Sequence, residues 1–456
     1  MRSRGTTVLI LWLLGSMMPA SGDDGYRLWL KYDKISDSAY LKECGKAFNS
    51  VIVTGDSPVL RAAHEELIAG LGGMTGSRIT DVHSLTRGGV VVAGTFESSP
   101  LIASLLSDSD PGKTGEEGFI IRSVRQKGKR ITVIASDGEN GVLYGVFHLL
   151  RLVSMGAPVN DLSVLEKPAV ALRLLNHWDN LDRSVERGYA GSSIWNWHLL
   201  PDYISPLYKD YARANASIGI NGAVITNVNA DALVLTAQYL RKVAALAEIM
   251  RPYGIKVYLT ARFSAPAEIG GMRTSDPLDP GVIRWWSDKA AEIYSLIPDF
   301  GGFLVKANSE GQPGPQNYGR THADGANMLA DAVAPFGGVV MWRAFVYDNN
   351  VPSDRAKQAC NEFIPLDGLF RSNVLVQVKN GPIDFQPREP FHPLFGSMPS
   401  TSQMIEFQIT QEYLGCATHL VFLAPLFEEC LRSDTYARGQ GSTVADVIDG
   451  SLYGQS

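Results

Sequence analysis

The chain has 456 residues, of which 45% are hydrophobic and 19% are charged, and its formal net charge at pH 7 is -6. This length predicts two or three domains, and the composition excludes a disordered or fibrous protein. The acidic balance argues against a nucleic-acid partner bound through its phosphates, although a local cluster of cations would still attract a small acidic molecule.

The first 22 residues have the pattern of a secretory signal peptide. Arg2 and Arg4 form a basic start, Thr7–Leu14 is a short apolar core, and Ala20–Gly22 supplies small residues for cleavage. The alternative, an uncleaved membrane anchor, needs a longer apolar run, and no later stretch is apolar enough to cross a bilayer. We therefore predict a protein that is secreted or periplasmic, with no membrane attachment after cleavage.

Residues 23–157 are predicted to form a separate N-terminal α/β domain. Three short apolar runs have the pattern of buried strands: Val51–Val53, Val90–Gly94 and Ile131–Ala135. Two segments carry apolar residues at helical spacing: Ser57–Leu71 and Gly141–Leu152. Pro158–Pro168 is predicted to be the linker to a second domain, which spans residues 158–456.

From Leu172 the chain alternates strand and helix patterns. The predicted strands are Leu172–Asn176, Gly222–Thr226, Ile255–Thr260, Gly302–Lys306, Gly337–Arg343, Val374–Lys379, Met404–Thr410 and His419–Leu423, with helices such as Leu233–Tyr253 and Val282–Ile297 between them. Eight βα units over roughly 270 residues predict a (β/α)8 TIM barrel. An open doubly wound sheet is the alternative, but the residues after the first strand, Asn176–Asn180, are not the glycine-rich phosphate loop of that fold.

Three carboxylates follow predicted strands of this barrel. Glu310 comes after the fourth strand, Asp384 after the sixth, and Glu412 at the end of the seventh. In a (β/α)8 barrel, residues at the carboxyl ends of strands carry the chemistry. Glycoside hydrolysis needs one protonated carboxylic acid and a second carboxylate that activates water or attacks. A single carboxylate of this kind is usually a surface or capping group, but three together favour hydrolysis.

Three cations occupy similar positions. Lys306 precedes Glu310 by four residues, Arg343 ends the fifth strand, and Lys379 ends the sixth. A cation at a buried strand end needs an anionic partner, because an unpaired buried charge is costly. Either these cations pair with Glu310 and Asp384 themselves, or they bind a carboxylate of the substrate.

Aromatic residues are frequent after the first predicted strand, at Trp178, Tyr189, Trp195 and Trp197. Flat apolar faces of sugars stack on indole rings, so these side chains are candidates for substrate contacts. The alternative is that they pack the loop beneath the barrel rim.

The histidines and cysteines predict neither a metal site nor a cofactor site. His177, His322 and His392 match no standard ligand spacing, and the four cysteines include no Cys-x-x-Cys pair. Cys416 and Cys430 flank a predicted strand and are expected to be buried thiols.

Several long segments resemble α-glucuronidases of glycoside hydrolase family 67. These segments are Leu174–Asp182, Glu186–Gly191, Trp195–Trp197, Lys306–Pro315, Met341–Phe345, Gln377–Pro390 and Glu406–Leu414. The resemblance extends over essentially the whole mature chain. It implies an inverting hydrolase of acidic xylo-oligosaccharides (aldouronic acids) derived from glucuronoxylan. Such an enzyme releases 4-O-methyl-D-glucuronic acid, α-1,2-linked to the non-reducing terminal xylose.

The resemblance also implies roles for individual residues. Glu310 matches the general acid of the family, and Asp384 and Glu412 match the pair that activates the water. The residues that match those holding the uronic acid are Trp178, Lys306, Arg343 and Lys379. For an inverting mechanism we expect the acid and base carboxyl groups to be about 6.5–9.5 Å apart.

The chain departs from the family pattern at its C-terminus. Members normally continue into a long helical domain, whereas this sequence ends at Ser456, so dimer contacts made by that domain are not expected here. Two alternatives to an α-glucuronidase stay open. A retaining β-hexosaminidase-like enzyme carries an Asp-Glu pair after the fourth strand, but here Ser309 precedes Glu310. A carbohydrate-binding protein without turnover is the other.

Overall fold

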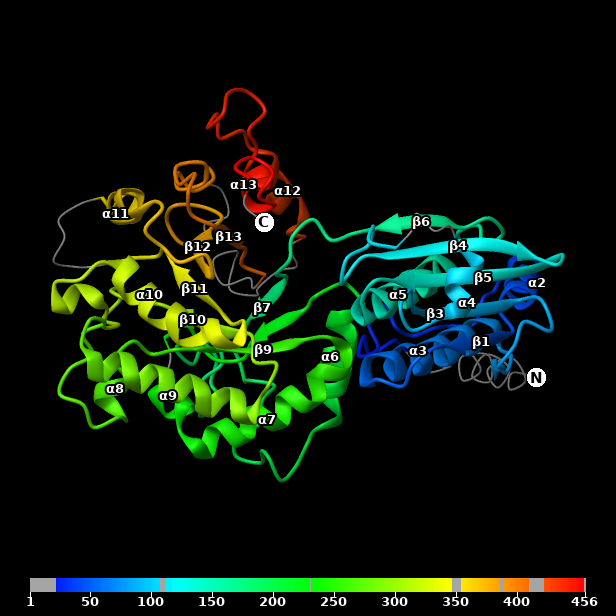
Figure 1. Ribbon diagram of the computed structural model, residues 1–456, viewed down its shortest axis with the longest axis horizontal. Coiled ribbons are helices and arrows are strands. Elements are labelled where there is room, and N and C mark those ends of the chain that lie inside the picture. Colours follow the sequence, from blue (N-terminus) through cyan, green and yellow to red (C-terminus); the bar gives the residue numbers. More distant parts are fainter. Residues whose placement is uncertain are drawn as a thin grey trace, which may run out of the picture.

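The computed structural model describes residues 22–106, 111–229, 231–346, 354–385, 389–409 and 422–454. Two sheets, each covered by helices, lie side by side in the molecule (Figure 1). The predicted signal peptide lies almost entirely outside the described residues and stays a prediction. No helix in the described ranges has the length and hydrophobicity that a membrane span requires.

The first sheet is mixed and has six strands in the order β2-β1-β3-β5-β4-β6. Its strands are β1 (Ser50–Val53), β2 (Thr80–Asp81), β3 (Val90–Thr95), β4 (Phe119–Gln126), β5 (Lys129–Ser136) and β6 (Ser163–Glu166). Its helices are α2 (Ser38–Ala47), α3 (Pro58–Thr75), α4 (Pro100–Leu105) and α5 (Glu139–Ser154). The three strands and two helices predicted for this region are all present.

Alternation along β3 explains why helices cover both faces of this sheet. Val91 and Ala93 join the core that includes residues of α3 and α5, whereas Val90 and Val92 join a separate cluster with Ile102 of α4. Successive side chains of a strand point to opposite faces, so one fully apolar strand serves two hydrophobic layers.

The predicted linker Pro158–Pro168 contains a strand. β6 pairs antiparallel with β4, and it continues the first sheet beyond residue 157, where the first domain was predicted to end. β4 and β5 form a hairpin around Lys127 and Gly128, which both have positive φ angles, as the tight turn of a hairpin requires. β4 was not predicted, because the polar residues in its second half interrupt the apolar run that indicates a strand.

The second sheet has seven strands in the sequential order β13-β12-β11-β10-β9-β8-β7, and every neighbouring pair is parallel. The strands are β7 (Leu174–Asn176), β8 (Gly222–Val224), β9 (Lys256–Thr260), β10 (Gly302–Val305), β11 (Val339–Arg343), β12 (Val374–Lys379) and β13 (Gln403–Glu406). A doubly wound sheet would reverse its strand order, so the sequential order confirms the barrel class.

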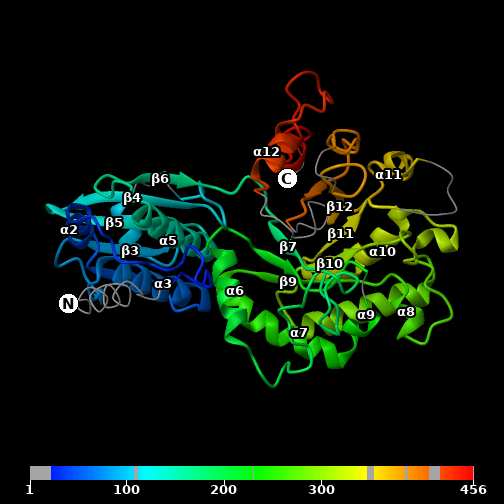
Figure 2. The same cartoon turned by 180° about the vertical axis from the view of Figure 1, so that it is seen from behind.

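Helices lie between most of these strands along the chain, although none separates β12 from β13 in the described residues, and Figures 1 and 2 show α6 to α10 on the outer side of the sheet. The α-helices are α6 (Pro206–Ala216), α7 (Ala237–Met250), α8 (Ala265–Glu268), α9 (Pro280–Leu296), α10 (His322–Val333), α11 (Arg355–Phe363), α12 (Ala424–Arg432) and α13 (Val444–Ile448). Short 3-10 helices are η1 (Ala232–Leu235), η2 (Arg251–Tyr253), η3 (Pro315–Tyr318), η4 (Ala334–Phe336) and η5 (Ile364–Leu366).

The sheet curls until its two edge strands approach each other. Asn176 is the last residue of β7 and Glu406 is the last residue of β13, and the Asn176 side-chain amide donates a hydrogen bond of 3.1 Å to the Glu406 carboxylate. The strand predicted at His419–Leu423 lies mostly outside the described residues, so seven of the eight predicted strands are observed.

An ion pair with a buried carboxylate joins the domain of the first sheet to the domain of the second. Arg213 of α6 binds Glu66 of α3 through three hydrogen bonds, of 3.1, 2.8 and 2.6 Å, and the Tyr32 hydroxyl donates to the same carboxylate at 2.5 Å. Glu66 is 5% exposed. Arg173 and Glu117 form a second pair across the interface, at 2.7 Å. In Figure 2, α6 lies directly beside the first domain.

Candidate active site

Four charged residues lie at the carboxyl ends of consecutive barrel strands. Lys306 follows β10, Arg343 ends β11, Lys379 ends β12 and Glu406 ends β13. Their exposed fractions are 4%, 2%, 4% and 9%. The strands are parallel and adjacent, so these side chains share one rim of the sheet. The predicted placement of the three cations at buried strand ends is confirmed.

Lys306 and Glu310 form an ion pair at this rim. The Lys306 ammonium donates to Glu310 Oε2 and also to Asn229 Oδ1, at 2.7 Å. The other oxygen of Glu310 lies 3.2 Å from the Arg187 guanidinium. Both oxygens of the candidate acid therefore contact a cation.

This pairing determines the charge of Glu310. Burial alone raises the pKa of Glu310, but the hydrogen bond and charge of Lys306, with Arg187 and Lys379, outweigh burial and hold it below its ordinary value. Burial lowers the pKa of Lys306, and Glu310 partly opposes that effect. In the ligand-free protein Glu310 is consequently an ionised carboxylate at neutral pH, unlike the protonated acid that glycoside cleavage requires.

Lys379 pairs with Asp384, five residues along the chain. Its ammonium also lies 3.1 Å from the ring centroid of Phe345 and 4.4 Å from that of Phe385, a cation–π arrangement. Burial, reinforced by the nearby charge of Arg343, lowers the pKa of Lys379 to about 8.

Arg343 pairs with Glu406, a carboxylate that the sequence analysis did not single out. Arg343 Nη2 lies 2.6 Å from Glu406 Oε2, and Nε donates to Gln377 Oε1 at 3.1 Å. The predicted strand ran to Thr410, which placed Glu406 inside it; β13 in fact stops at Glu406. The sequence signal that could have identified Glu406 is the one that identified Lys306 and Arg343: apolar residues followed by a charged residue at the strand end.

Glu186 is a second carboxylate that sequence reasoning missed. It is 7% exposed and lies 3.3 Å from Arg187, and its charge raises the pKa of Lys306. Its backbone amide donates to the Trp178 carbonyl at 2.8 Å, and its own carbonyl accepts from the Asn227 side chain at 3.3 Å. Glu186 follows no strand directly, so the strand-end pattern did not reveal it.

Strained backbone is concentrated around these groups. Glu186, Asn308, Glu310 and Phe385 all have positive φ angles, between 49° and 54°. Such angles are costly for residues with a side chain, and they gather where a site fixes unusual geometry.

The aromatic candidates separate into two groups. Trp195 and Trp197 are fully buried; Trp195 packs against Tyr208 and Trp197 against Tyr239, so they fill the loop beneath the rim. Trp178 is half-buried, and its ring centroid lies 6.2 Å from that of Phe385, beside Lys379. Only Trp178 therefore keeps the predicted position for a sugar contact among these three tryptophans.

The three histidines lie in separate places and have protein partners. His177 contacts the Tyr211 hydroxyl at 2.7 Å, and His322 contacts Glu362 at 2.8 Å. Burial, with the charge of Lys379, lowers the pKa of His392 to about 4. Cys430 is a buried free thiol, as predicted, and Cys416 lies outside the described residues.

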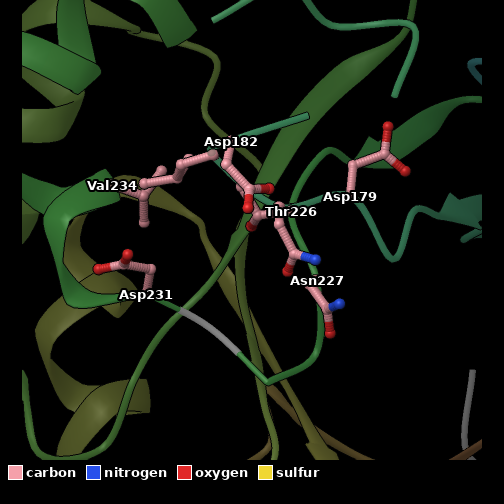
Figure 3. A pocket seen from close by; sticks show the side chains of 8 residues that line it. Asp179, Asp182, Thr226, Asn227, Asp231 and Val234 are labelled. Carbon is pink, nitrogen blue, oxygen red and sulfur yellow. The ribbon is translucent and has the colours of Figure 1, made fainter. Parts of the chain in front are cut away.

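An acidic cavity of about 290 Å³ adjoins the loop after β7. Its lining residues are Asp179, Asn180, Leu181, Asp182, Thr226, Asn227, Asp231 and Val234 (Figure 3). In Figure 3 the Asp179 carboxylate points away from those of Asp182 and Asp231, and it accepts a hydrogen bond of 2.5 Å from Ser193. None of the predicted site residues lines this cavity.

The structure thus brings Glu310 and Asp384 into one network with the three predicted cations. Glu412 lies outside the described residues, so its part in the site and the predicted separation of acid and base stay predictions. The arrangement is a polar, charge-rich rim suited to an anionic ligand, with ionisable carboxylates within reach of it.

Comparison with family models then decides the family. The model of the glycosyl hydrolase family 67 middle domain matches residues 152–456, and that of the family 67 N-terminus matches residues 28–149. The chain belongs to glycosyl hydrolase family 67. A family 67 relative from Aspergillus flavus, named probable alpha-glucuronidase A, is 40% identical over 98% of this chain and 53% of its own length. Alpha-glucuronidase A from Emericella nidulans has the same identity and coverage.

The chain spans about half the length of these family 67 relatives. A solved structure of a family GH115 4-O-methyl-alpha-glucuronidase with specificity for decorated arabinogalactans is also similar. It has a TM-score of 0.50 and 13% identity, over 80% of this chain and 49% of that one. At that identity the likeness concerns the fold alone.

Proposed function

We propose that this family 67 protein is an inverting α-glucuronidase that removes α-1,2-linked 4-O-methyl-D-glucuronic acid from the non-reducing end of acidic xylo-oligosaccharides. The observation that carries the proposal is the set of three buried cations at adjacent strand ends, each with a carboxylate partner. The names of the relatives support it.

The cations explain how a uronic acid would be selected. Lys306, Arg343 and Lys379 all reach the same rim, and a sugar carboxylate can replace one of the protein carboxylates that they now hold. The cations then pair with protein carboxylates in the free protein and with the substrate carboxylate in the complex. Both alternatives from the sequence analysis therefore apply, one to each state of the site. Phe385 supplies a ring face beside Lys379, and Trp178 lies next to Phe385.

The carboxylates supply the acid and base functions. Glu310 donates a proton to the departing xylose oxygen, and Asp384, with Glu412, removes a proton from the attacking water. Bond making and bond breaking then occur on opposite faces of the sugar in a single displacement. This assignment requires Glu310 to be protonated when substrate is bound.

Product stereochemistry tests the proposal directly. We expect incubation with an aldouronic acid, followed by proton NMR, to show β-configured 4-O-methylglucuronic acid as the first product. A first product with retained α configuration, or cleavage confined to hexosaminides, would favour the retaining alternative. Binding of the oligosaccharide without turnover would favour a carbohydrate-binding protein.

The role of Lys379 predicts the pH dependence of binding. Its pKa is about 8, so the ammonium loses its charge as the pH rises through that value. We expect the dissociation constant of D-glucuronate to increase above that pH, by at most about tenfold per pH unit because one proton is linked. Isothermal titration calorimetry at a series of pH values measures it.

The matched variant for that titration is Lys379→Arg. Its guanidinium keeps its charge throughout the range, so the weakening of glucuronate binding should move to higher pH. An unchanged pH profile in this variant would show that another group is responsible.

A further inference from the structure

The charged residues described at the family 67 rim pair with one another before any ligand is present. In the described part of the site, four cations contact four carboxylates. The contacts are Lys306 with Glu310, Arg187 with Glu310 and Glu186, Arg343 with Glu406, and Lys379 with Asp384. Lys306, Arg343 and Lys379 are at most 4% exposed, so water screens their charges poorly, whereas the side chains of Arg187 and Glu310 are 54% and 27% exposed.

A uronic acid brings one more negative charge into this network of ion pairs. It cannot contact a cation here without competing with a carboxylate that is already in place. A displaced carboxylate that remains buried loses an opposite charge, and loss of a cation within about 4–6 Å raises a carboxyl pKa by about 1–3. Uptake of a proton offsets that loss.

Glu310 is the carboxylate best placed to take that proton. Burial is the largest influence on its pKa and already favours the protonated form; the cations Lys306, Arg187 and Lys379 oppose it. The strongest of these, Lys306, keeps a second partner in Asn229 and can exchange its anion without being left unpaired.

Two of the other carboxylates have contacts that fix them or their cation in place. Glu406 also accepts a hydrogen bond from Asn176, so it keeps a donor if Arg343 moves. Lys379 lies against the rings of Phe345 and Phe385, which fix its ammonium beside Asp384. Glu186 contacts Arg187 and lies near Lys306, so its charge also favours protonation of a neighbouring acid.

We propose that this site binds an anionic sugar together with one proton, which the Glu310 carboxylate takes up from solvent. The inference rests on the proposed function and adds the step that converts the ionised Glu310 of the free protein into an acid. The carboxylate of the substrate then causes Glu310 to be protonated, and Glu310 can act as the proton donor. A neutral sugar of the same shape leaves Glu310 ionised, so selection for uronic acids is expressed in turnover as well as in binding.

Isothermal titration calorimetry measures the number of protons taken up when the sugar binds. Titration of the protein with D-glucuronate in buffers of different ionisation enthalpy, near about pH 5.5, should report uptake of about one proton per bound sugar. At that pH the ligand is ionised and free Glu310, whose pKa is lowered, has lost its proton. Any binding of D-glucose should take up none.

Variants identify the group that is protonated. We expect Glu310→Gln to bind glucuronate with no proton uptake, and Glu292→Gln, which changes a carboxylate paired with Lys289 on α9 and not at the rim, to retain the uptake. Glucuronate binding without proton uptake by the unmodified protein, or uptake that persists in Glu310→Gln, would overturn this inference and leave the proposed function standing. Failure of glucuronate to bind at all would overturn both. The comparison of glucuronate with glucose needs no variant, so it remains decisive if a variant does not fold.

Discussion

Glu310→Gln should reduce turnover of an aldouronic acid by about 10²- to 10⁴-fold, the usual contribution of a general acid. Glutamine keeps the size of the side chain and a hydrogen-bond acceptor for Lys306, but it has no proton to give to the departing xylose oxygen. Initial rates from quantified 4-O-methylglucuronic acid measure the loss.

A substrate with a better leaving group distinguishes the loss of the proton donor from general damage to the active site. The leaving group of an activated aryl α-glucuronide is a stable aryloxide, which departs without protonation. The same Glu310→Gln variant should therefore hydrolyse this substrate at much closer to the normal rate. Glu292→Gln is the matched control, because Glu292 forms a pair with Lys289 on α9, away from the rim. Near-normal turnover of the aldouronic acid by Glu310→Gln would exclude the assigned role.

Arg213→Met should lower the free energy of unfolding by about 3–5 kcal/mol, because it leaves Glu66 buried without its partner. The methionine keeps most of the apolar stem and removes the three hydrogen bonds that Arg213 donates to Glu66. Urea denaturation followed by circular dichroism measures the change, provided that both domains unfold in one transition.

The same two helices supply the control for this prediction. Lys209 and Glu65 also bridge α6 and α3, at 3.7 Å, but their side chains are 61% and 67% exposed. Lys209→Met should therefore cost no more than about 1 kcal/mol. The double variant Glu66→Gln/Arg213→Met removes the buried charge and keeps an acceptor for Tyr32, so it should recover much of the loss. Equal effects of Arg213→Met and Lys209→Met would contradict a buried pair.

Buried parallel strands were the most predictable part of the fold. β10 is a continuous apolar run, and β12 is apolar except for Gln377. A lysine ends each run, and both the strand and the charge at its end were located from the sequence. β4 and β6 were not found, because their half-exposed polar residues break the apolar pattern and their pairing depends on a hairpin and a distant partner.

The candidate site was predictable where a charged residue ends a strand or follows it within a few residues. Lys306, Arg343 and Lys379 meet that condition, and the structure places them together. Glu186 does not, since an irregular loop after β7 carries it to the rim. The partners of each cation could not be chosen either, because the choice depends on distances between side chains from separate strands.

The hydrogen bond between Asn176 and Glu406 also bears on how the protein acquires its site. It joins residues 230 positions apart, whereas each βα unit forms from contacts within a few tens of residues. Loop closure over such a distance is slow and follows local structure formation. An intermediate in which the two sheet edges have not met lacks the hydrogen bond from Asn176 to Glu406, the carboxylate that pairs with Arg343. If glucuronate binds at this site as proposed, we expect binding to recover during refolding only after the two sheet edges meet, an event that helix content alone does not register.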